Sequence, residues 1–269
     1  MVTISRVEEC WSYKLKLPCS SGHFLIAYAK SGSPEAEARF SEELGGGWLD
    51  TVAALVQEEE EAGLVTAALE TLAELLQQSG ARAAGDQAQV TKVLNIVKRV
   101  MRGQCACLEA GEGEEQGEAV LLAAVEIIPP LGRALGPARF GPCFTGLLAL
   151  LLRKAGSKAS AAERSCSVRA IAESVEPLSG AGVLAALLRH LLPVLRDCCR
   201  DTEEDCRNNA VYGLGELLLW GGQELGQHRD TILGSLTQML KVGGTIRPVR
   251  GHSRRPSARP SRAPRCRTT

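Results

Sequence analysis

A period of 43 residues constrains this 269-residue chain more than any other feature of its sequence. The run from Leu148 to Arg153 repeats as the run from Leu191 to Arg196, and the same offset maps Arg164 onto Arg207. Three further pairs have this spacing, namely Ile171 and Leu214, Glu173 and Glu216, and Val175 and Leu218. Because the offset keeps an arginine and a glutamate as well as leucines, it indicates a repeated unit of two helices and the loop between them.

Two-helix units of about 40–47 residues are typical of HEAT and armadillo repeats. One helix pair cannot bury its apolar faces alone, so neighbouring pairs must stack into a superhelix. Only 4% of the residues are aromatic, so Leu, Ala and Val must fill the core, and these favour helices over β-sandwiches. We therefore predict an all-α fold, a HEAT/armadillo-type α-solenoid of stacked antiparallel helix pairs with about four to five repeats. The alternative is an ordinary bundle of leucine-rich helices.

The chain divides into three segments by composition and periodicity. Residues 1–47 hold five of the ten aromatic residues among scattered Gly, Ser and Pro, and we predict an irregular segment there. Residues 48–242 form the predicted solenoid, with helical stripes at about 48–56, 64–80, 86–101, 119–135, 140–154, 161–178, 183–199, 201–220 and 231–241. Residues 243–269 are rich in Arg, Pro and Ser, which predicts a disordered tail.

Three local signals interrupt the helical pattern. Pro129 and Pro130 are predicted to kink or break the helix at 119–135, and Pro193 to interrupt and bend the helix at 183–199. The acidic, glycine-bearing stretch from Glu109 to Glu118 is predicted to separate two helices as an insertion.

Charge is distributed unevenly, although the formal net charge is zero. The last 25 residues, from Thr245, contain eight arginines and no acid, whereas the first 244 residues contain 23 basic and 31 acidic residues. The body is therefore acidic and suits basic partners. The tail has three interpretations: contact with nucleic-acid phosphates, a nuclear-localisation patch, or translation past a splice junction. The third is favoured because the tail begins where the repeat pattern is lost. The tail could also fold back onto the acidic body.

The sequence offers no arrangement of residues for catalysis or metal binding. Its four histidines are scattered among different elements, and no glycine-rich phosphate loop is present. Cys105 with Cys107, and Cys198 and Cys199 with Cys206, lack the two spaced pairs of a structural zinc site. We expect them to be small buried thiols, with metal ligation or a regulatory disulfide as the alternative. We therefore predict no enzymatic activity, no cofactor and no metal.

Ten cysteines are too few for a disulfide scaffold of this length, and no apolar run approaches a membrane span. We therefore expect an intracellular chain with reduced thiols and no membrane span.

Residues 136–222 carry a resemblance to a known family. The segments concerned are Phe140, Gly146 to Leu151, Ala162 to Ser165, Ala172 to Ser174, Leu191 to Leu195 and Arg207 to Glu216. In these segments the chain resembles the C-terminal half of importin-β (karyopherin) family nuclear transport receptors, and the match is weaker over residues 48–135. The resemblance implies import of cargo from cytoplasm to nucleus, localisation in both, nucleoporins as partners, and cargo release triggered by GTP-bound Ran.

Two departures from the family affect these expectations. The main Ran-binding repeats of the family lie at the N-terminus and have no counterpart here, so Ran binding is not predicted. The array also stops without the polar cap of a solenoid, so we expect a fragment, a truncated isoform or an imperfect gene model.

Acidic residues are the candidate cargo-binding groups. Glu173 and Glu216 repeat on second helices, which line the concave side in the family. The complete candidate set is Glu173, Glu216, Asp201, Glu203, Glu204 and Asp205. Stacked repeats place equivalent positions in register, so these acids can form a track for basic protein cargo that is histone-like or bears a nuclear signal. The alternative is a solvated surface.

Two other functions remain open. One is a generic HEAT-repeat scaffold without a role in transport. The other is association with nucleic acid through the basic tail, which has no aromatic residue for base stacking.

Overall fold

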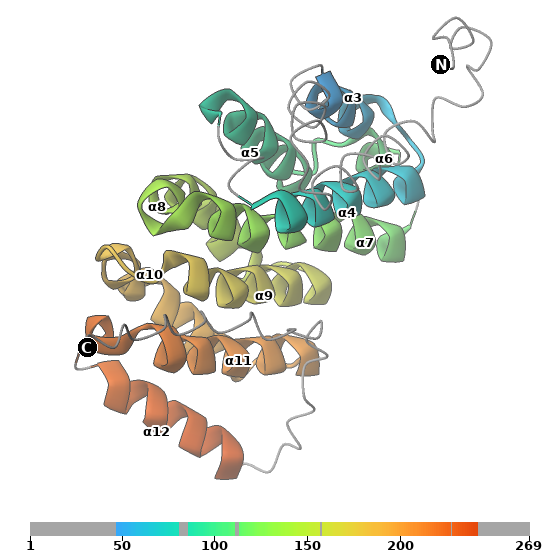
Figure 1. Ribbon diagram of the computed structural model, residues 1–269. Coiled ribbons are helices and arrows are strands. Elements are labelled where there is room, and N and C mark those ends of the chain that lie inside the picture. The colour runs from blue at the N-terminus through green and yellow to red at the C-terminus, as the bar shows by residue number, and fades with distance from the viewer. Residues whose placement is uncertain (1–46, 81–85, 111–112, 157, 227, 242–269) are drawn as a thin grey trace, which may run out of the picture.

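The computed structural model describes residues 47–80, 86–110, 113–156, 158–226 and 228–241. Within these ranges the chain forms helices and connecting turns, with no strand (Figure 1). The elements are α3 (Leu49–Glu58), α4 (Ala62–Ser79), α5 (Gln87–Met101), α6 (Ala106–Glu109), α7 (Glu114–Glu126), α8 (Ile128–Lys154), α9 (Ala161–Leu178), α10 (Val183–Cys198), α11 (Glu204–Trp220), η5 (Gly222–Leu225) and α12 (His228–Lys241). The predicted irregular segment up to residue 46 and the predicted tail from residue 243 lie outside the described residues.

The helices form two layers in an elongated stack (Figure 1). In one layer α4, α7, α9 and α11 pack side by side in chain order, together with residues 128–135 of α8; we call this the B layer. The first helices of each pair form the A layer, namely α3, α5, residues 137–154 of α8, α10 and α12. Four helix pairs and an opening fifth helix therefore stack as an α-solenoid, which confirms the predicted fold class.

The apolar stripes read from the sequence face the interior of this stack. All six leucines of the stripe predicted on α10 are buried. One continuous core cluster extends from Trp48, beside α3, to Ile232 in α12. Each fully buried leucine contributes roughly 1.5–3 kcal/mol relative to an exposed one, so burial between pairs accounts for much of the stability of the stack.

The arginine kept by the 43-residue period has the same structural role in two repeats. The Nη1 atom of Arg164 donates to the carbonyl oxygen of Ala159 at 2.8 Å. The Nη1 atom of Arg207 donates to the carbonyl oxygen of Thr202 at 2.7 Å. Both acceptors lie five residues before their arginine, in the turn that precedes a B-layer helix. The repeated arginine therefore fastens the turn between the two helices of its pair.

The prolines follow the sequence prediction at one site and not at the other. Pro129 and Pro130 occupy the first turn of α8, where a missing N–H costs no intrahelical hydrogen bond. The helix predicted over residues 119–135 is thus divided at Ile127, immediately before these prolines, as predicted. The helical path is broken a second time at Gly136, whose φ of +71° and ψ of 164° are not helical. The predicted interruption at Pro193 is wrong, because α10 continues through it from Val183 to Cys198.

The acidic stretch before α7 is only partly an insertion. Gly113 has a φ of +100°, which suits glycine, and α7 begins immediately after it at Glu114. The second half of the predicted insertion therefore forms the first turns of a B-layer helix. This places its glutamates beside the next repeats.

One helical stretch, Glu115–Lys154, is long and apolar enough by length and composition to cross a membrane, contrary to the expectation that no run approaches this length. However, 67% of its most apolar window is buried inside the protein, and the path changes direction at Gly136. Within the described residues, this stretch is therefore a core element of the solenoid.

Candidate protein-binding groove

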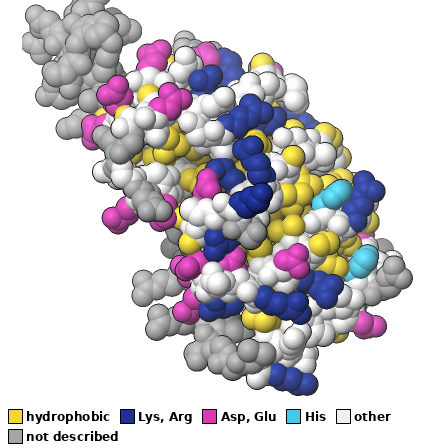
Figure 2. Space-filling view, turned by 180° about the vertical axis from the view of Figure 1, so that it is seen from behind, with side chains coloured by type: hydrophobic (Ala, Val, Ile, Leu, Met, Phe, Trp, Pro, Cys, Tyr) yellow, Lys and Arg dark blue, Asp and Glu magenta, His cyan; other side chains and the backbone are white. Residues whose placement is uncertain are grey.

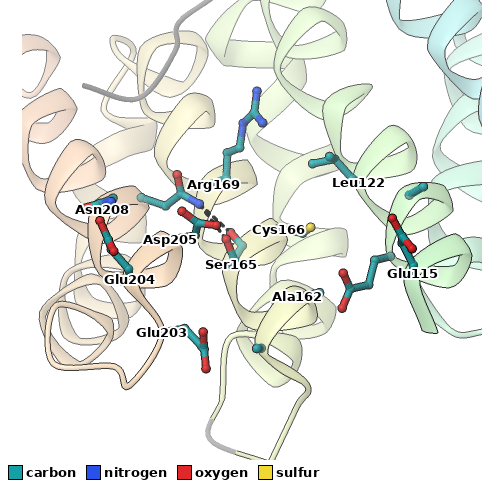
Figure 3. A pocket seen from close by; sticks show the side chains of 14 residues that line it. Glu115, Leu122, Ala162, Ser165, Cys166, Arg169, Glu203, Glu204, Asp205 and Asn208 are labelled. Atoms are coloured by element: carbon teal, nitrogen blue, oxygen red, sulfur yellow. Dashed lines mark hydrogen bonds between the residues drawn. The ribbon is translucent and has the colours of Figure 1, made fainter. Parts of the chain in front are cut away.

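The N-terminal halves of α7, α9 and α11 border a hollow on the B layer with a volume of about 720 Å³ (Figure 3). We call it the acidic groove. Its floor is formed by α9, which contributes small residues such as Ala161, Ala162 and Ser165. The neighbouring helices α7 and α11 supply its two sides. Small side chains on the central helix thus leave the space that larger polar residues border.

The start of α9 is fixed by a capping box. The Ser160 hydroxyl accepts a hydrogen bond from the Glu163 backbone N–H at 3.1 Å, and the Glu163 carboxylate accepts one from the Ser160 N–H at 3.2 Å. Such reciprocal bonds satisfy two N–H groups that have no intrahelical partner. Glu163 also pairs with Lys154 at the end of α8. The floor of the groove is therefore anchored to the A layer at its open edge.

Five carboxylates line the acidic groove. Glu115 and Glu118 lie on the first turns of α7, and Glu203, Glu204 and Asp205 lie at the start of α11. The last three side chains are exposed, and Figure 3 shows them on the side of the groove opposite Glu115. Because helix N-termini carry partial positive charge, acids are favoured in these first turns. The groove can therefore present negative charge at little cost to the fold.

The cation among the lining residues, Arg169, is already neutralised. Its Nη2 atom lies 3.2 Å from a carboxylate oxygen of Glu126, and its Nε atom lies 2.9 Å from one of Glu173. Burial lowers the pKa of Arg169, but the hydrogen bond and charge of Glu173, with the charge of Glu126, outweigh burial and raise it. The arginine stays charged and paired, so it does not compensate the five lining carboxylates.

Polar contacts also join the floor to the α11 side. The Asn209 side-chain amide donates to the backbone carbonyl and to the hydroxyl of Ser165, at 3.1 and 3.0 Å. Next to Ser165, burial raises the pKa of the Cys166 thiol to about 11, so this thiol is protonated at neutral pH. The Ser165 hydroxyl on the floor is therefore hydrogen-bonded and the Cys166 thiol is protonated, so the floor offers no activated nucleophile.

The structure divides the six predicted acids into two groups. Glu203, Glu204 and Asp205 are exposed and meet at the groove. The other three, Asp201, Glu173 and Glu216, are engaged within the fold. Glu173 is paired with Arg169, as described above. Glu216 is only 7% exposed and accepts a hydrogen bond from the indole N–H of Trp220 at 2.9 Å.

Asp201 is fixed by the arginine of the preceding repeat. Its two carboxylate oxygens accept hydrogen bonds from Nε and Nη2 of Arg164 at 2.7 and 2.8 Å. Both side chains are largely buried, with exposed fractions of 11% and 12%. The guanidinium of Arg164 holds the pKa of the Asp201 carboxyl well below its usual range, despite burial. Asp201 thus stabilises the turn that carries Glu203, Glu204 and Asp205.

Sequence reasoning missed Glu115 and Glu118 as groove residues. The acidic stretch was interpreted as an insertion, because its glycines interrupt the helical pattern. The available signal was the helix start after Gly113, which places Glu115 and Glu118 one turn apart on α7. Their position beside α9 depends on packing between repeats, so local sequence does not determine it.

The cysteine clusters form close thiol pairs. The Sγ atoms of Cys105 and Cys107 lie 3.0 Å apart, and both residues are buried. Cys206, in the first turn of α11, is hydrogen-bonded to Cys198 at the end of α10, and this bond lowers the pKa of the Cys198 thiol. The two thiols thus face one another across the turn between α10 and α11. The described part of the chain contains no group of three or more His, Cys, Asp or Glu residues able to hold a metal ion.

The stacked helix pairs and the acidic groove along their second helices place this chain in the class of α-solenoid repeat proteins. Over 192 residues, or 69% of the chain, the sequence is 33% identical to Importin-4 of Mus musculus. It is 32% identical over 193 residues to Importin-4 of Homo sapiens. The aligned region spans 18% of each relative's length. The resemblance to the importin-β family is thereby confirmed as a partial-homologue relationship.

No family model matches the chain. Among solved structures, a computationally designed armadillo repeat protein for modular peptide recognition is similar with a TM-score of 0.47 and 17% identity, covering 87% of this chain and 91% of that chain. A designed armadillo repeat protein in complex with the peptide (KR)4 has a TM-score of 0.46 and 16% identity, covering 82% and 91%.

Proposed function

We propose that the acidic groove binds a Lys/Arg-rich segment of a partner protein. One observation carries the proposal: five carboxylates, from α7 and from the start of α11, border one hollow whose lining cation is already paired. A lysine or arginine side chain placed between the two sides of the groove would approach carboxylates from two different repeats. An ion pair at 4 Å contributes from about 1 kcal/mol in bulk water to about 4 kcal/mol near a protein surface, before desolvation is subtracted. Several such pairs favour fast, salt-sensitive association.

The proposed biological role is that of a protein-binding module of a nuclear import receptor. The partial homology to Importin-4 supports this role, with basic cargo that is histone-like or bears a nuclear signal. It also supports localisation in both cytoplasm and nucleus, with nucleoporins as further partners. The role is binding, not catalysis, because the groove offers a paired arginine and a protonated thiol instead of an activated nucleophile.

Removal of three groove charges tests the proposal. In the variant Glu203→Gln/Glu204→Gln/Asp205→Asn, we expect the Kd for a labelled lysine- and arginine-rich peptide to rise about tenfold at moderate salt. Fluorescence anisotropy with the full chain measures this directly. The matched control Glu58→Gln/Glu60→Gln/Glu61→Gln removes the same charge from exposed positions at the turn between α3 and α4. Equal weakening in both variants would show that net charge, and not the groove, determines binding.

A further inference from the structure

Charge separates between the two layers of the solenoid. The helices of the A layer carry ten basic and four acidic residues, whereas those of the B layer carry four basic and twelve acidic residues. The body is acidic overall, but its two layers carry net charges of opposite sign. The acidic groove uses only one of them. The basic face has no part in the function proposed above.

Basic side chains converge across helix boundaries on the A layer. Lys98 of α5 and Arg139 of α8 both lie close enough to Cys143 to lower its thiol pKa, although burial raises it overall. A side-chain carbon added at Gly146 of α8 would lie 3.5 Å from the Lys98 ammonium group. Seen from behind, Lys and Arg side chains form a band down the middle of the face, with a second group below it (Figure 2). Apolar side chains lie beside the band, and a few acidic side chains lie among the basic ones. The basic residues thus belong to a mixed basic and apolar surface.

A small hollow lies at the C-terminal end of this surface, between α10 and α12. It has a volume of about 150 Å³ and is lined by Arg196, Arg200, Ser235, Gln238 and Met239, among others. Both guanidinium groups are close enough to the buried Cys199 to lower its pKa, although burial raises it to about 11. Arg196 lies in the last turn of α10 and Arg200 in the turn that follows it, and both are exposed, so together they can donate to one carboxylate. We call this site the α10–α12 hollow.

We infer that the A layer is a second binding surface, which takes an acidic protein segment that also carries apolar side chains, with one carboxylate seated in the α10–α12 hollow. Arg196 and Arg200 supply charge, Gln238 supplies an amide donor, and Met239 supplies apolar contact. Such a mixture matches a peptide of acidic and aliphatic residues. This surface is independent of the acidic groove, because it lies on the other layer.

A nucleic acid fits the same surface less well. Duplex DNA carries one charge for about every 1.7 Å of its axis, so it requires continuous positive charge. Here Asp197 lines the hollow itself, and Asp230 follows in α12. Single strands bind on exposed aromatic rings. The aromatic residues described on the A layer, Phe140 and Phe144, are fully buried.

The test compares three fluorescent probes on the intact chain: a peptide of alternating acidic residues and leucine, a DNA duplex and a single-stranded RNA. The variant Arg196→Gln/Arg200→Gln removes two positive charges from the hollow. The control Lys158→Glu changes the net charge equally at an exposed turn residue outside the A-layer helices. We expect the double variant to weaken peptide binding about fivefold and the control to leave it within twofold. The arginines of residues 245–269 are unchanged in both variants, so their contribution cancels.

A second variant tests the site by a gain of affinity. Asp197→Asn removes the acid that lines the hollow, and peptide binding should strengthen about twofold. The inference is overturned if the control weakens binding as much as the double variant, or if Asp197→Asn has no effect. It is also overturned if the nucleic-acid probes bind more tightly than the peptide and lose affinity in the double variant. Circular dichroism of each variant confirms that it is folded.

Discussion

The two consecutive repeats formed by residues 137–178 and 183–220 share a sequence period but use equivalent positions differently. At the turn before the second helix, Ser160, Ala161 and Ala162 of the first repeat correspond to Glu203, Glu204 and Asp205 of the next. In the first repeat these residues cap α9 and leave open space, and in the next they place charge beside that space. The repeat therefore conserves the framework contacts, while the groove arises where neighbouring repeats differ.

The arginines show the same contrast. Arg164 and Arg207 both fasten a turn through a backbone carbonyl, but Arg164 also makes a two-fold hydrogen bond with Asp201 of the following repeat. Arg164 therefore joins two repeats, whereas Arg207 stabilises only its own repeat. Three experiments follow from these differences.

The largest expected effect is on stability. Arg164→Ala removes the partner of a largely buried carboxylate and should lower the free energy of unfolding by about 3 kcal/mol. Arg207→Ala, which removes only bonds to carbonyl oxygens, should lower it by about 1 kcal/mol. Urea denaturation followed by circular dichroism measures both. Equal losses would show that the link between repeats contributes no more than the fastening of one turn.

A smaller effect concerns pH. Because the folded pKa of Asp201 lies below that of an unfolded aspartate, near 3.9, its stabilisation is present above that pH and is lost as pH falls through and below it. The difference in unfolding free energy between wild type and Asp201→Asn should therefore shrink by about 1 kcal/mol from pH 5 to pH 3. A difference that is constant over this range would contradict the pairing with Arg164.

The smallest effect concerns binding. Ala161→Glu gives the first repeat the acid that the next repeat has at Glu204, and it lies in the first helical turn, where an acid is favoured. We expect the Kd for the basic peptide to fall about threefold. The control Ala161→Gln adds similar volume without charge and should not tighten binding. If both variants bind the peptide more tightly, the gain in affinity comes from added contact area and not from charge.

These comparisons also show what the sequence could predict. Periodicity identified the helix pairs, their order and the burial of the α10 stripe, because these depend on apolar spacing along one helix. It also identified Glu203, Glu204 and Asp205 as exposed acids near a helix start. It did not separate them from Asp201, because the partner of Asp201 is 37 residues away in sequence.

Other features depended on three-dimensional context in the same way. Glu216 is buried because its helical phase turns it inward, where Trp220 one turn later supplies a hydrogen-bond donor. Pro129 and Pro130 divide the helical stretch as predicted, because they fit the first turn of the following helix. The second break, at Gly136 directly before Pro137, was not predicted.

Gly136 has a mechanical consequence for the whole solenoid. It joins the B-layer helix of one pair to the A-layer helix of the next with a single non-helical residue, whereas the next pair is joined by residues 179–182. A joint of one residue has few torsions that can yield under load. When the array is pulled or bent, the second and third pairs should therefore move together as one stiff body. The deformation should occur mainly at the later joints, such as residues 179–182.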